Sequence, residues 1–309
     1  MTNPIEISQT KDYGDMALCN LCSINLVEFR KANNTQKDFI CKMAVRGLDD
    51  AITNGLCPIA EGAISNELYR YIGVGMLNAA NALALEQIEI DTQEAAEWFD
   101  EVTEDLCYRL YYQSMLLSKE RGRFPRFDET KWAEGLTPVH MSRKFYPGAW
   151  ELTEFGKNFE KNGYLDKWNK LGELIKENGI RHAQVWAIAP TANSGKAINA
   201  TESTEPVMGL MYKEEGMSNV VTLAPNIRKN MAYYKPAFDC DQFGLVLNAI
   251  VRQKYGDQAQ SITLYFKDVS SLKMLSKIHN FGFVNGVKTF YYVKQPKNLD
   301  LDDCVSCAV

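Results

Sequence analysis

Two pairs of cysteines with the same spacing stand at opposite ends of the sequence. Cys19 and Cys22 lie near the start, and Cys304 and Cys307 lie in a polar tail that ends at Val309. Four thiolates with this spacing are typical of a zinc site, but the pairs are far apart and nothing around the second pair would fix it in place. A tethered tail instead keeps its dithiol at roughly millimolar effective concentration near an inner disulfide, with which it exchanges by thiolate attack. The spacing therefore favours electron transfer from the tail to an inner site.

A second stretch combines an apolar segment with a loop of small and polar residues. Residues 184–189 predict a short strand, and a helix is expected to start after Gly195-Lys196. The loop between them consists of Pro190, Thr191, Ala192, Asn193 and Ser194. Such a loop at a helix N-terminus presents N–H groups, hydroxyls and a positive dipole to an anion. The spacing does not match a Walker A loop, so nucleotide hydrolysis is not implied. It predicts either a phosphate site or a capped structural turn.

Tyr291 and Tyr292 are adjacent on a predicted strand. In a pleated strand, neighbouring side chains face opposite sides, which would place one ring in the core and one on the surface. The alternative is a pair of stacked phenols that relays a radical. Both interpretations remain open at the level of spacing.

The elements that would position these residues indicate an α/β protein. Apolar residues at helical spacing predict helices at 38–54, 65–83, 91–121 and 241–255, and Cys19 to Phe29 predicts a tight turn that enters a helix. Gly73 and Gly75, inside the second helix, suggest close approach of another backbone. Residues 261–267, 272–281 and 287–293 predict a strand, a helix and a parallel strand, as in an α/β layer or barrel.

The remaining segments predict less. Residues 128–179 are expected to be rich in loops with a short helix near 171–175, and the basic, aromatic loop 120–127 predicts either an anion pocket or a solvated turn. Single cysteines are most often buried, so core positions are expected for Cys41, Cys57, Cys107 and Cys240.

Composition excludes several classes of protein. The net charge of −5 gives no basic footprint for nucleic acid. No apolar run approaches the ~18 residues of a membrane span, and the first residues lack the pattern of a signal peptide. Eight cysteines without a secretory signal favour a reducing compartment. We therefore expect a cytoplasmic protein, in the host cell if a phage encodes it.

Four motifs, in order along the chain, resemble the class I ribonucleotide reductase large (catalytic) subunit, most of all the versions carried by T-even-type bacteriophages. They are residues 17–26, residues 189–191 with 200–206, residues 288–292, and the terminal Cys304-x-x-Cys307. The resemblance implies an α/β fold, namely the C-terminal half of a ten-stranded α/β barrel of two antiparallel five-stranded halves, with added helices. Residues 1–295 would form this barrel part and residues 296–309 a flexible redox-active tail. The implied reaction is reduction of ribonucleoside diphosphates to 2′-deoxyribonucleoside diphosphates for DNA synthesis, by a radical mechanism with dithiol reduction.

The resemblance also implies roles for residues and partners. Cys19 would be the retained member of the inner redox pair, and Cys304 and Cys307 the tail shuttle. Tyr291 and Tyr292 would bring the radical in from the small subunit. Residues Pro190 to Ser194 would hold the substrate diphosphate. No cofactor would be bound directly, because a di-iron/tyrosyl small subunit supplies the radical and thioredoxin or glutaredoxin supplies the electrons.

The sequence departs from the family in three ways. Family chains are much longer, and the second inner cysteine is missing here. The finger-loop motif Asn-Leu-Cys-x-Glu would fall at residues 2–6, where Pro4 replaces the radical cysteine and only Glu6 fits. Cys22 is a poor substitute, because it falls where relatives usually carry glycine.

We therefore expect the C-terminal piece of a split subunit, active only with an N-terminal piece and the small subunit. Glu6 would then be either an acid/base carboxylate or a surface residue at the chain terminus. The alternatives are a catalytically inactive fragment that binds nucleotides or regulates, and a structural protein with zinc on the two cysteine pairs.

Overall fold

The computed structural model describes residues 7–9, 14–214, 220–267 and 272–296. Within these residues, five extended segments lie side by side and run in the same direction. Strand β3 (Asn20–Asn25) pairs with β4 (Ile72–Leu77), and β7 (Thr263–Tyr265) pairs with β8 (Tyr292–Lys294), both in parallel. Residues 184–188 connect the two pairs through parallel bridges from Trp186 to Val74 and from Ile188 to Gln260. The expected strand at 184–189 is thus an extended segment held by single bridges.

The helix predicted at 65–83 is wrong. Helix α3 (Ala60–Tyr69) ends at Arg70, whose φ is 52°, and the chain then forms strand β4 and helix α4 (Ala79–Leu85). Every residue of β4 is buried, as is typical of a parallel strand covered on both faces, so its apolar residues form a run without a helical or strand period. The expectation of close backbone approach is confirmed, because a Cβ at Gly75 would lie 2.3 Å from the carbonyl oxygen of Ala187.

The tight turn predicted at Cys19 is also wrong. Residues 20–25 form β3, and the helix α1 (Leu26–Lys31) follows it directly. The side chain of Asn25 caps α1 by accepting a hydrogen bond from the N–H of Val27 (3.1 Å), which ends the strand and begins the helix at one residue.

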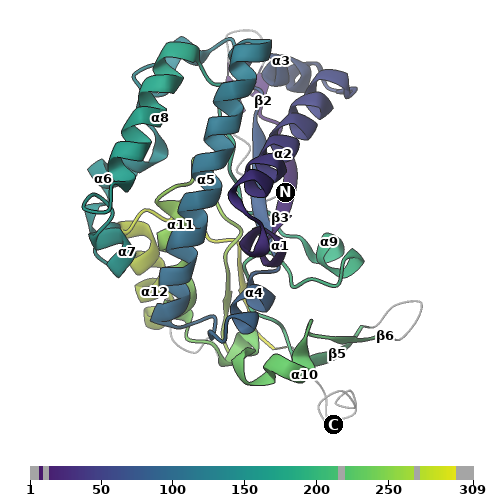
Figure 1. The fold of residues 1–309 in the computed structure, drawn as a ribbon. Coiled ribbons are helices and arrows are strands. Elements are labelled where there is room, and N and C mark those ends of the chain that lie inside the picture. Colours follow the sequence, from purple (N-terminus) through teal and green to yellow (C-terminus); the bar gives the residue numbers. More distant parts are fainter. Residues whose placement is uncertain (1–6, 10–13, 215–219, 268–271, 297–309) are drawn as a thin grey trace.

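Four of the predicted helices are present in the structure. They are α2 (Asn34–Asn54), α5 (Gln93–Arg121), α11 (Gln242–Gln253) and α12 (Leu272–Val284), close to the predicted ranges. Helix α5 begins where the side chain of Thr92 accepts a hydrogen bond from the N–H of Ala95, and ends at Gly122 with φ 85°. It contacts α2, α11 and α8 (Figure 1), so it is the central helix of this layer.

Residues 127–179 are more helical than predicted. They form η1 (Phe127–Glu129), α6 (Pro138–Phe145), η2 (Pro147–Trp150), α7 (Glu154–Lys157) and α8 (Tyr164–Asn178). The bulky side chains explain the difference, since Trp150 and Trp168 are buried against Tyr255 and tertiary packing of this kind stabilises short helices.

The other elements lie at the periphery. Strands β1 (Ile7–Gln9) and β2 (Gly14–Met16) pair antiparallel, as do β5 (Met211–Glu214) and β6 (Val220–Leu223). Short helices are α9 (Ala192–Ala197), α10 (Ile227–Asn230), η3 (Met231–Tyr233) and η4 (Ala237–Asp239). In Figure 1, α9 and the β5–β6 hairpin project away from the side on which α5 and α8 lie.

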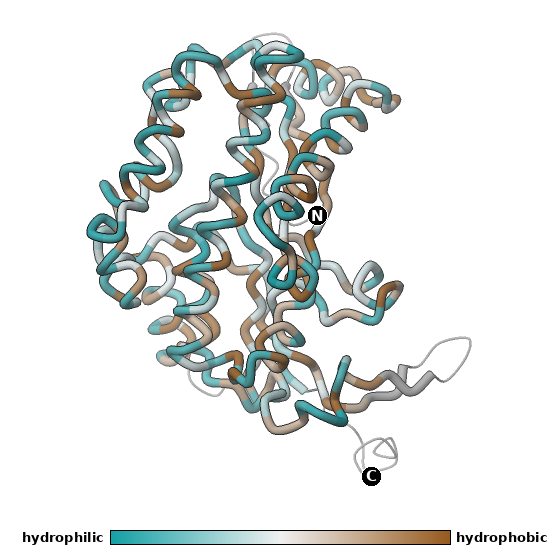
Figure 2. The backbone as a smooth tube through the Cα atoms, in the orientation of Figure 1, coloured by the Kyte–Doolittle hydropathy of each residue, from teal (hydrophilic) through white to brown (hydrophobic). Residues whose placement is uncertain are grey.

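The hydrophobic core lies between the strands and this helix layer. Figure 2 shows hydrophobic stretches along the central strands and in alternate turns of the helices, as expected for amphipathic helices on a buried sheet. Cys41, Cys107 and Cys240 are buried as predicted, whereas Cys57 is only half-buried. None of the helices in the described part of the chain is long and apolar enough to cross a membrane.

Candidate functional site

The thiol of Cys19 lies over β4, next to a glycine. Its Sγ donates to Oε1 of Gln258 at 3.6 Å, and the Nε2 of Gln258 donates to the carbonyl oxygen of Ile72 at 2.7 Å, which fixes which end of the amide faces the sulfur. A Cβ at Gly73 would lie 3.1 Å from this Sγ. Because Gly73 has no side chain, the half-buried thiol of Cys19 fits in the space above it.

Cys22 lies in different surroundings. It packs against the main hydrophobic core, and burial raises the pKa of its thiol to about 11. A thiol with so high a pKa is almost entirely protonated at neutral pH and is a poor nucleophile or metal ligand. Cys19 and Cys22 are both free thiols. Among the described residues there is no group of three or more His, Cys, Asp or Glu side chains arranged to hold a metal.

The predicted anion loop follows residues 184–188, the middle segment in the row of five parallel segments. Thr191 is buried, and its Oγ1 accepts a hydrogen bond from the N–H of Ser203 at 2.7 Å, so this hydroxyl holds the loop together. Pro190 lies before the helix, and Ala192, Asn193 and Ser194 form the first turn of α9 and are exposed. The N–H groups of a first helical turn have no partners within the helix. A helix does follow the extended segment, but it starts at Ala192, inside the predicted loop, and ends at Ala197, so the helix start predicted after Lys196 is wrong. The phosphate site itself remains a prediction.

Asparagines connect the loops at the carboxyl ends of three neighbouring segments. Asn78, which follows β4 with φ 69°, accepts a hydrogen bond from the N–H of Thr201 at 2.9 Å through its Oδ1. Its Nδ2 donates to Oδ1 of Asn25, at the end of β3, at 3.0 Å. The carboxyl ends of parallel strands are where ligands bind in open α/β sheets, so this network holds the anion loop at the expected edge.

Tyr291 and Tyr292 are in contact. Their ring centroids are 3.9 Å apart with an angle of 46° between the planes, so the arrangement with rings on opposite faces is wrong. A hydrogen bond with Tyr292 raises the pKa of the Tyr291 phenol. Tyr292 is 51% exposed, which places the pair at an accessible edge of the sheet. Contact between the rings is what a relay requires; the relay itself remains a prediction.

A cavity of about 880 Å³ lies between α9, α10 and the β7–β8 pair. Glu205 in its wall was not predicted to have a role, although it stands in the quoted segment 200–206. Its carboxylate accepts hydrogen bonds from the N–H of Thr263 (3.1 Å) and the hydroxyl of Tyr265 (3.0 Å). Burial nevertheless raises its pKa to about 7. Glu205 thus links residues 200–206, which follow the anion loop, to strand β7, which pairs with β8.

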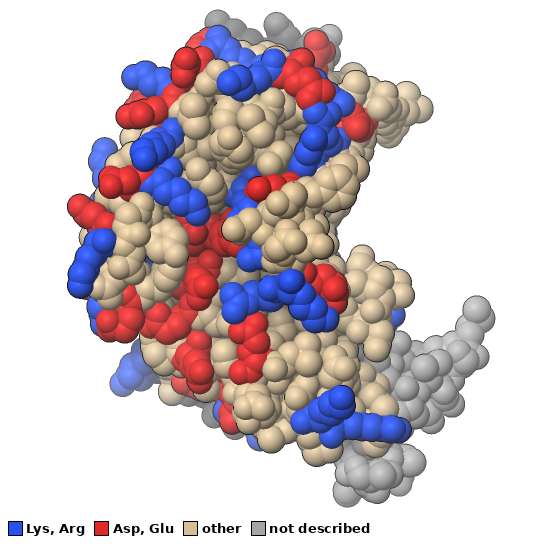
Figure 3. Space-filling model, viewed as in Figure 1, with Lys and Arg blue, Asp and Glu red and all other residues tan. Residues whose placement is uncertain are grey.

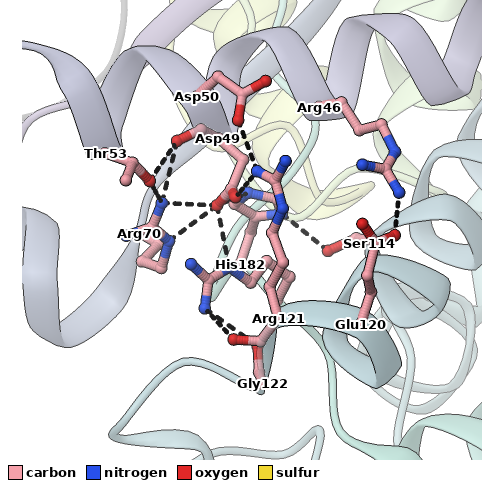
Figure 4. Close-up of polar contacts among 11 residues, drawn as sticks. Arg46, Asp49, Asp50, Thr53, Arg70, Ser114, Glu120, Arg121, Gly122 and His182 are labelled. Atoms are coloured by element: carbon pink, nitrogen blue, oxygen red, sulfur yellow. Dashed lines mark hydrogen bonds and ion pairs between the residues drawn. The ribbon is translucent and has the colours of Figure 1, made fainter.

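A buried ionic cluster fixes the start of the segment that leads to the anion loop (Figure 4). Asp49 of α2 is fully buried and is paired with Arg70, Arg121 and Arg181 at 2.6–3.0 Å, and with His182 at 3.2 Å. Burial alone would raise the pKa of Asp49, but hydrogen bonds from His182, Arg121 and Arg70 lower it well below the usual range.

The cluster therefore joins α2, the end of α3, the end of α5 and residues 181–182 around one carboxylate. The three arginines of loop 120–127 are all paired with acids: Arg121 with Asp49 and Asp50, Arg123 with Asp128, and Arg126 with Glu129. These pairs disfavour the anion-pocket interpretation of that loop. Glu6, Cys304 and Cys307 lie outside the described residues.

Comparison with known proteins identifies the family of this chain. Residues 1–228 and 215–293 match the model of the family "Ribonucleotide reductase, barrel domain". The chain belongs to the ribonucleotide reductase barrel-domain family. It is 31% identical to the ribonucleoside-diphosphate reductase subunit alpha of Helicobacter pylori strain J99, over 304 residues that cover 95% of this chain and 37% of the relative. The Treponema pallidum protein of the same name is 27% identical, covering 98% and 34%. The Bacillus subtilis protein is 26% identical, covering 94% and 42%.

This reductase barrel domain has the mixed α/β fold that the resemblance implied. It spans only about a third to two fifths of the length of the relatives it matches. The activity, substrates and partners of the whole relatives are therefore proposals for this chain.

Proposed function

We propose that the chain is the substrate- and redox-bearing part of a ribonucleoside-diphosphate reductase large subunit. The observation that carries the proposal is the family match along 1–293 together with the site it contains. That site has a thiol held over β4, an open first turn of helix α9 after the carboxyl end of the middle segment, and two tyrosine rings in contact at the edge formed by β8.

In this function the chain's residues bind the substrate and pass electrons. The N–H groups at Ala192 to Ser194 hold the diphosphate of a ribonucleotide. A thiyl radical on another polypeptide removes the 3′ hydrogen atom. The inner dithiol, of which Cys19 is one member, then gives two electrons and two protons, so that the 2′ hydroxyl leaves as water, a hydrogen takes its place and the two sulfurs form a disulfide. The 3′ hydrogen atom is finally returned to the sugar, which regenerates the thiyl radical on the other polypeptide.

The tail resets the site. A thiolate of Cys304 or Cys307 attacks the inner disulfide, and the second tail thiol completes the exchange, so that the tail becomes oxidised and the inner pair reduced. Thioredoxin or glutaredoxin then reduces the tail disulfide. The inner disulfide is half-enclosed by the fold, which is why a tethered dithiol suits it better than a separate protein.

The same proposal includes a second polypeptide. Pro4 cannot form a thiyl radical. The five parallel segments would contribute one half of a ten-stranded barrel. An N-terminal piece of the subunit would supply the radical cysteine, the second inner cysteine and the other half. The di-iron/tyrosyl small subunit would pass its radical through Tyr291 and Tyr292, and Glu6 would complete the site as an acid/base carboxylate.

Reconstitution tests this function. The chain is co-expressed with the matching N-terminal piece and the small subunit, and deoxynucleotide formation from ribonucleoside diphosphates is measured with thioredoxin or glutaredoxin present. We expect activity only from the complete set. Cys19→Ser should abolish it, whereas Cys57→Ser, which removes another half-buried thiol, should not.

A double variant, Cys304→Ser with Cys307→Ser, separates re-reduction of the inner disulfide by the tail from the reaction of the substrate. We expect it to keep about one turnover per enzyme and to lose further turnovers with the protein reductant. Full multi-turnover activity in this variant would contradict the tail assignment. Activity from this chain alone would contradict the division of the subunit. Nucleotide binding without complementation would indicate an inactive binding fragment, and stoichiometric zinc in purified protein would indicate the structural alternative.

A further inference from the structure

The cavity beside α9 has a positively charged rim. The basic residues in its wall are Lys196, Arg228, Lys229 and Lys294, and the acidic ones are Glu202 and Glu205. Arg228 and Lys229 are exposed and form no ion pair with any described residue. Figure 3 shows basic side chains at the position of α10 without acidic neighbours in that view. With Glu205 only partly charged near pH 7, the rim favours an anionic occupant.

The same cavity also exposes apolar side chains. Met208 and Leu223 line it and are each 45% exposed, and Val207 and Ile227 contribute to the wall. A diphosphate would use the cations and leave these apolar groups in water. An occupant with alternating acidic and apolar residues would match both features of the wall.

We propose that this cavity is the docking site of the chain's own carboxy-terminal segment, residues 297–309. That segment contains Leu299-Asp300-Leu301-Asp302-Asp303 immediately before Cys304. The three aspartates pair with the cationic rim, and the two leucines cover Met208 and Leu223. The purpose of docking, delivery of the tail dithiol, rests on the proposed function; the contact itself does not.

The position of β8 makes the contact reachable. β8 ends at Lys294, which itself lines the cavity. Asp300 is six residues farther along the chain, a span of at most ~20 Å when fully extended. The tail therefore begins three residues beyond Lys294, a residue of the cavity wall.

Disulfide trapping in the full chain tests the docking. Met208→Cys places a thiol in the cavity wall, and Leu272→Cys places one at the start of α12, outside the cavity lining and 76% exposed. Both positions are solvent-accessible, so the substitutions should leave folding nearly unchanged. The control thiol is the more exposed of the two and is close in sequence to β7, which pairs with β8. Mild oxidation followed by peptide mass spectrometry measures the disulfides that each new thiol forms with Cys304 or Cys307.

We expect trapping at position 208 to exceed trapping at 272 by roughly tenfold at low salt, since several exposed ion pairs act together. The ratio should fall to near one when Asp300, Asp302 and Asp303 are all changed to Asn, and also in about 0.5 M NaCl, which screens exposed charges. Equal trapping at the two positions, including none at either, would overturn the proposal, as would a preference for 208 that survives removal of the aspartates. The measurement needs neither the N-terminal piece nor deoxynucleotide formation, so its failure would be distinct from failure of the proposed function.

Discussion

Replacing Asp49 by Asn removes the charge at the centre of the buried cluster while keeping the shape of the side chain. The Asp49 carboxylate is fully buried and faces Arg70, Arg121 and Arg181. Loss of its charge leaves these guanidinium groups close together without compensation, and breaking a buried ion pair in this way typically costs about 3–5 kcal/mol. At roughly 2 °C per kcal/mol for a chain of this size, the melting temperature should fall by about 6–10 °C.

The neighbouring residue provides the matched control. Among the described residues Asp50 pairs with Arg121 alone, and its side chain is 49% exposed, so Asp50→Asn should cost no more than about 1 kcal/mol. Urea titration at pH 7, followed by circular dichroism, measures both variants. If Asp49→Asn lost no more stability than Asp50→Asn, the argument that this cluster organises the fold would be refuted.

The pH dependence gives an independent check on the same carboxylate. The pKa of Asp49 is lower in the folded chain than its unfolded value of about 3.9. Its contribution to stability is therefore complete above the unfolded pKa and is lost as the pH falls toward the folded pKa. The difference between wild type and Asp49→Asn should be constant from about pH 5 to 8 and should shrink below about pH 4. A difference that grew on acidification would contradict the assigned direction.

Substituting glycines tests the packing of β4. Gly75→Ala places a methyl group 2.3 Å from a facing carbonyl oxygen and should lower the free energy of unfolding by about 1–3 kcal/mol. Gly47→Ala in α2 meets nothing within 4 Å and should raise it by up to about 1 kcal/mol; equal effects in urea titration would contradict the packing argument. Tyr291→Phe and Tyr292→Phe should each keep the wild-type melting temperature, because the hydroxyls are at an accessible edge, yet abolish deoxynucleotide formation in the reconstituted enzyme. Glu205 retains its proton in the folded chain to about pH 7, so the stability of the wild-type protein should decline as the pH rises from about 4.5 to 7. Glu205→Gln lacks this titration, so its melting temperature relative to wild type should rise over the same interval. A difference in melting temperature that stayed constant with pH would argue against the raised pKa.

The elements that the sequence predicted correctly are those with a strong local period. Helix α5 has a cap at Thr92, a long amphipathic stretch and a terminal glycine, so its limits follow from nearby residues alone. The unit formed by β7, α12 and β8 was found for the same reason. Strand β4 was mistaken for a helix because a strand buried on both faces carries no alternation, and only Gly73 and Gly75 hinted at the neighbouring backbone.

The parts of the site that depend on distant residues were harder to predict. The amide of Gln258 beside Cys19 is 239 residues away in sequence, and the partners of Asp49 come from three separate segments. No spacing rule connects such residues, because the fold alone brings them together. Glu205 stood in a segment already singled out, but its role as a link to β7 depends on the register of that strand.

The cysteine and the tyrosine pair proposed for electron and radical transfer lie at the two ends of the row of parallel segments. Cys19 directly precedes β3, the first member, and Tyr292 opens β8, the last. Each of these strands pairs on one side only within the described residues. Any polypeptide that extended the row at either margin would therefore touch reactive side chains on arrival. Assembly and catalysis would share the same contacts, and a substitution that weakened such an association would reduce turnover while leaving this chain folded.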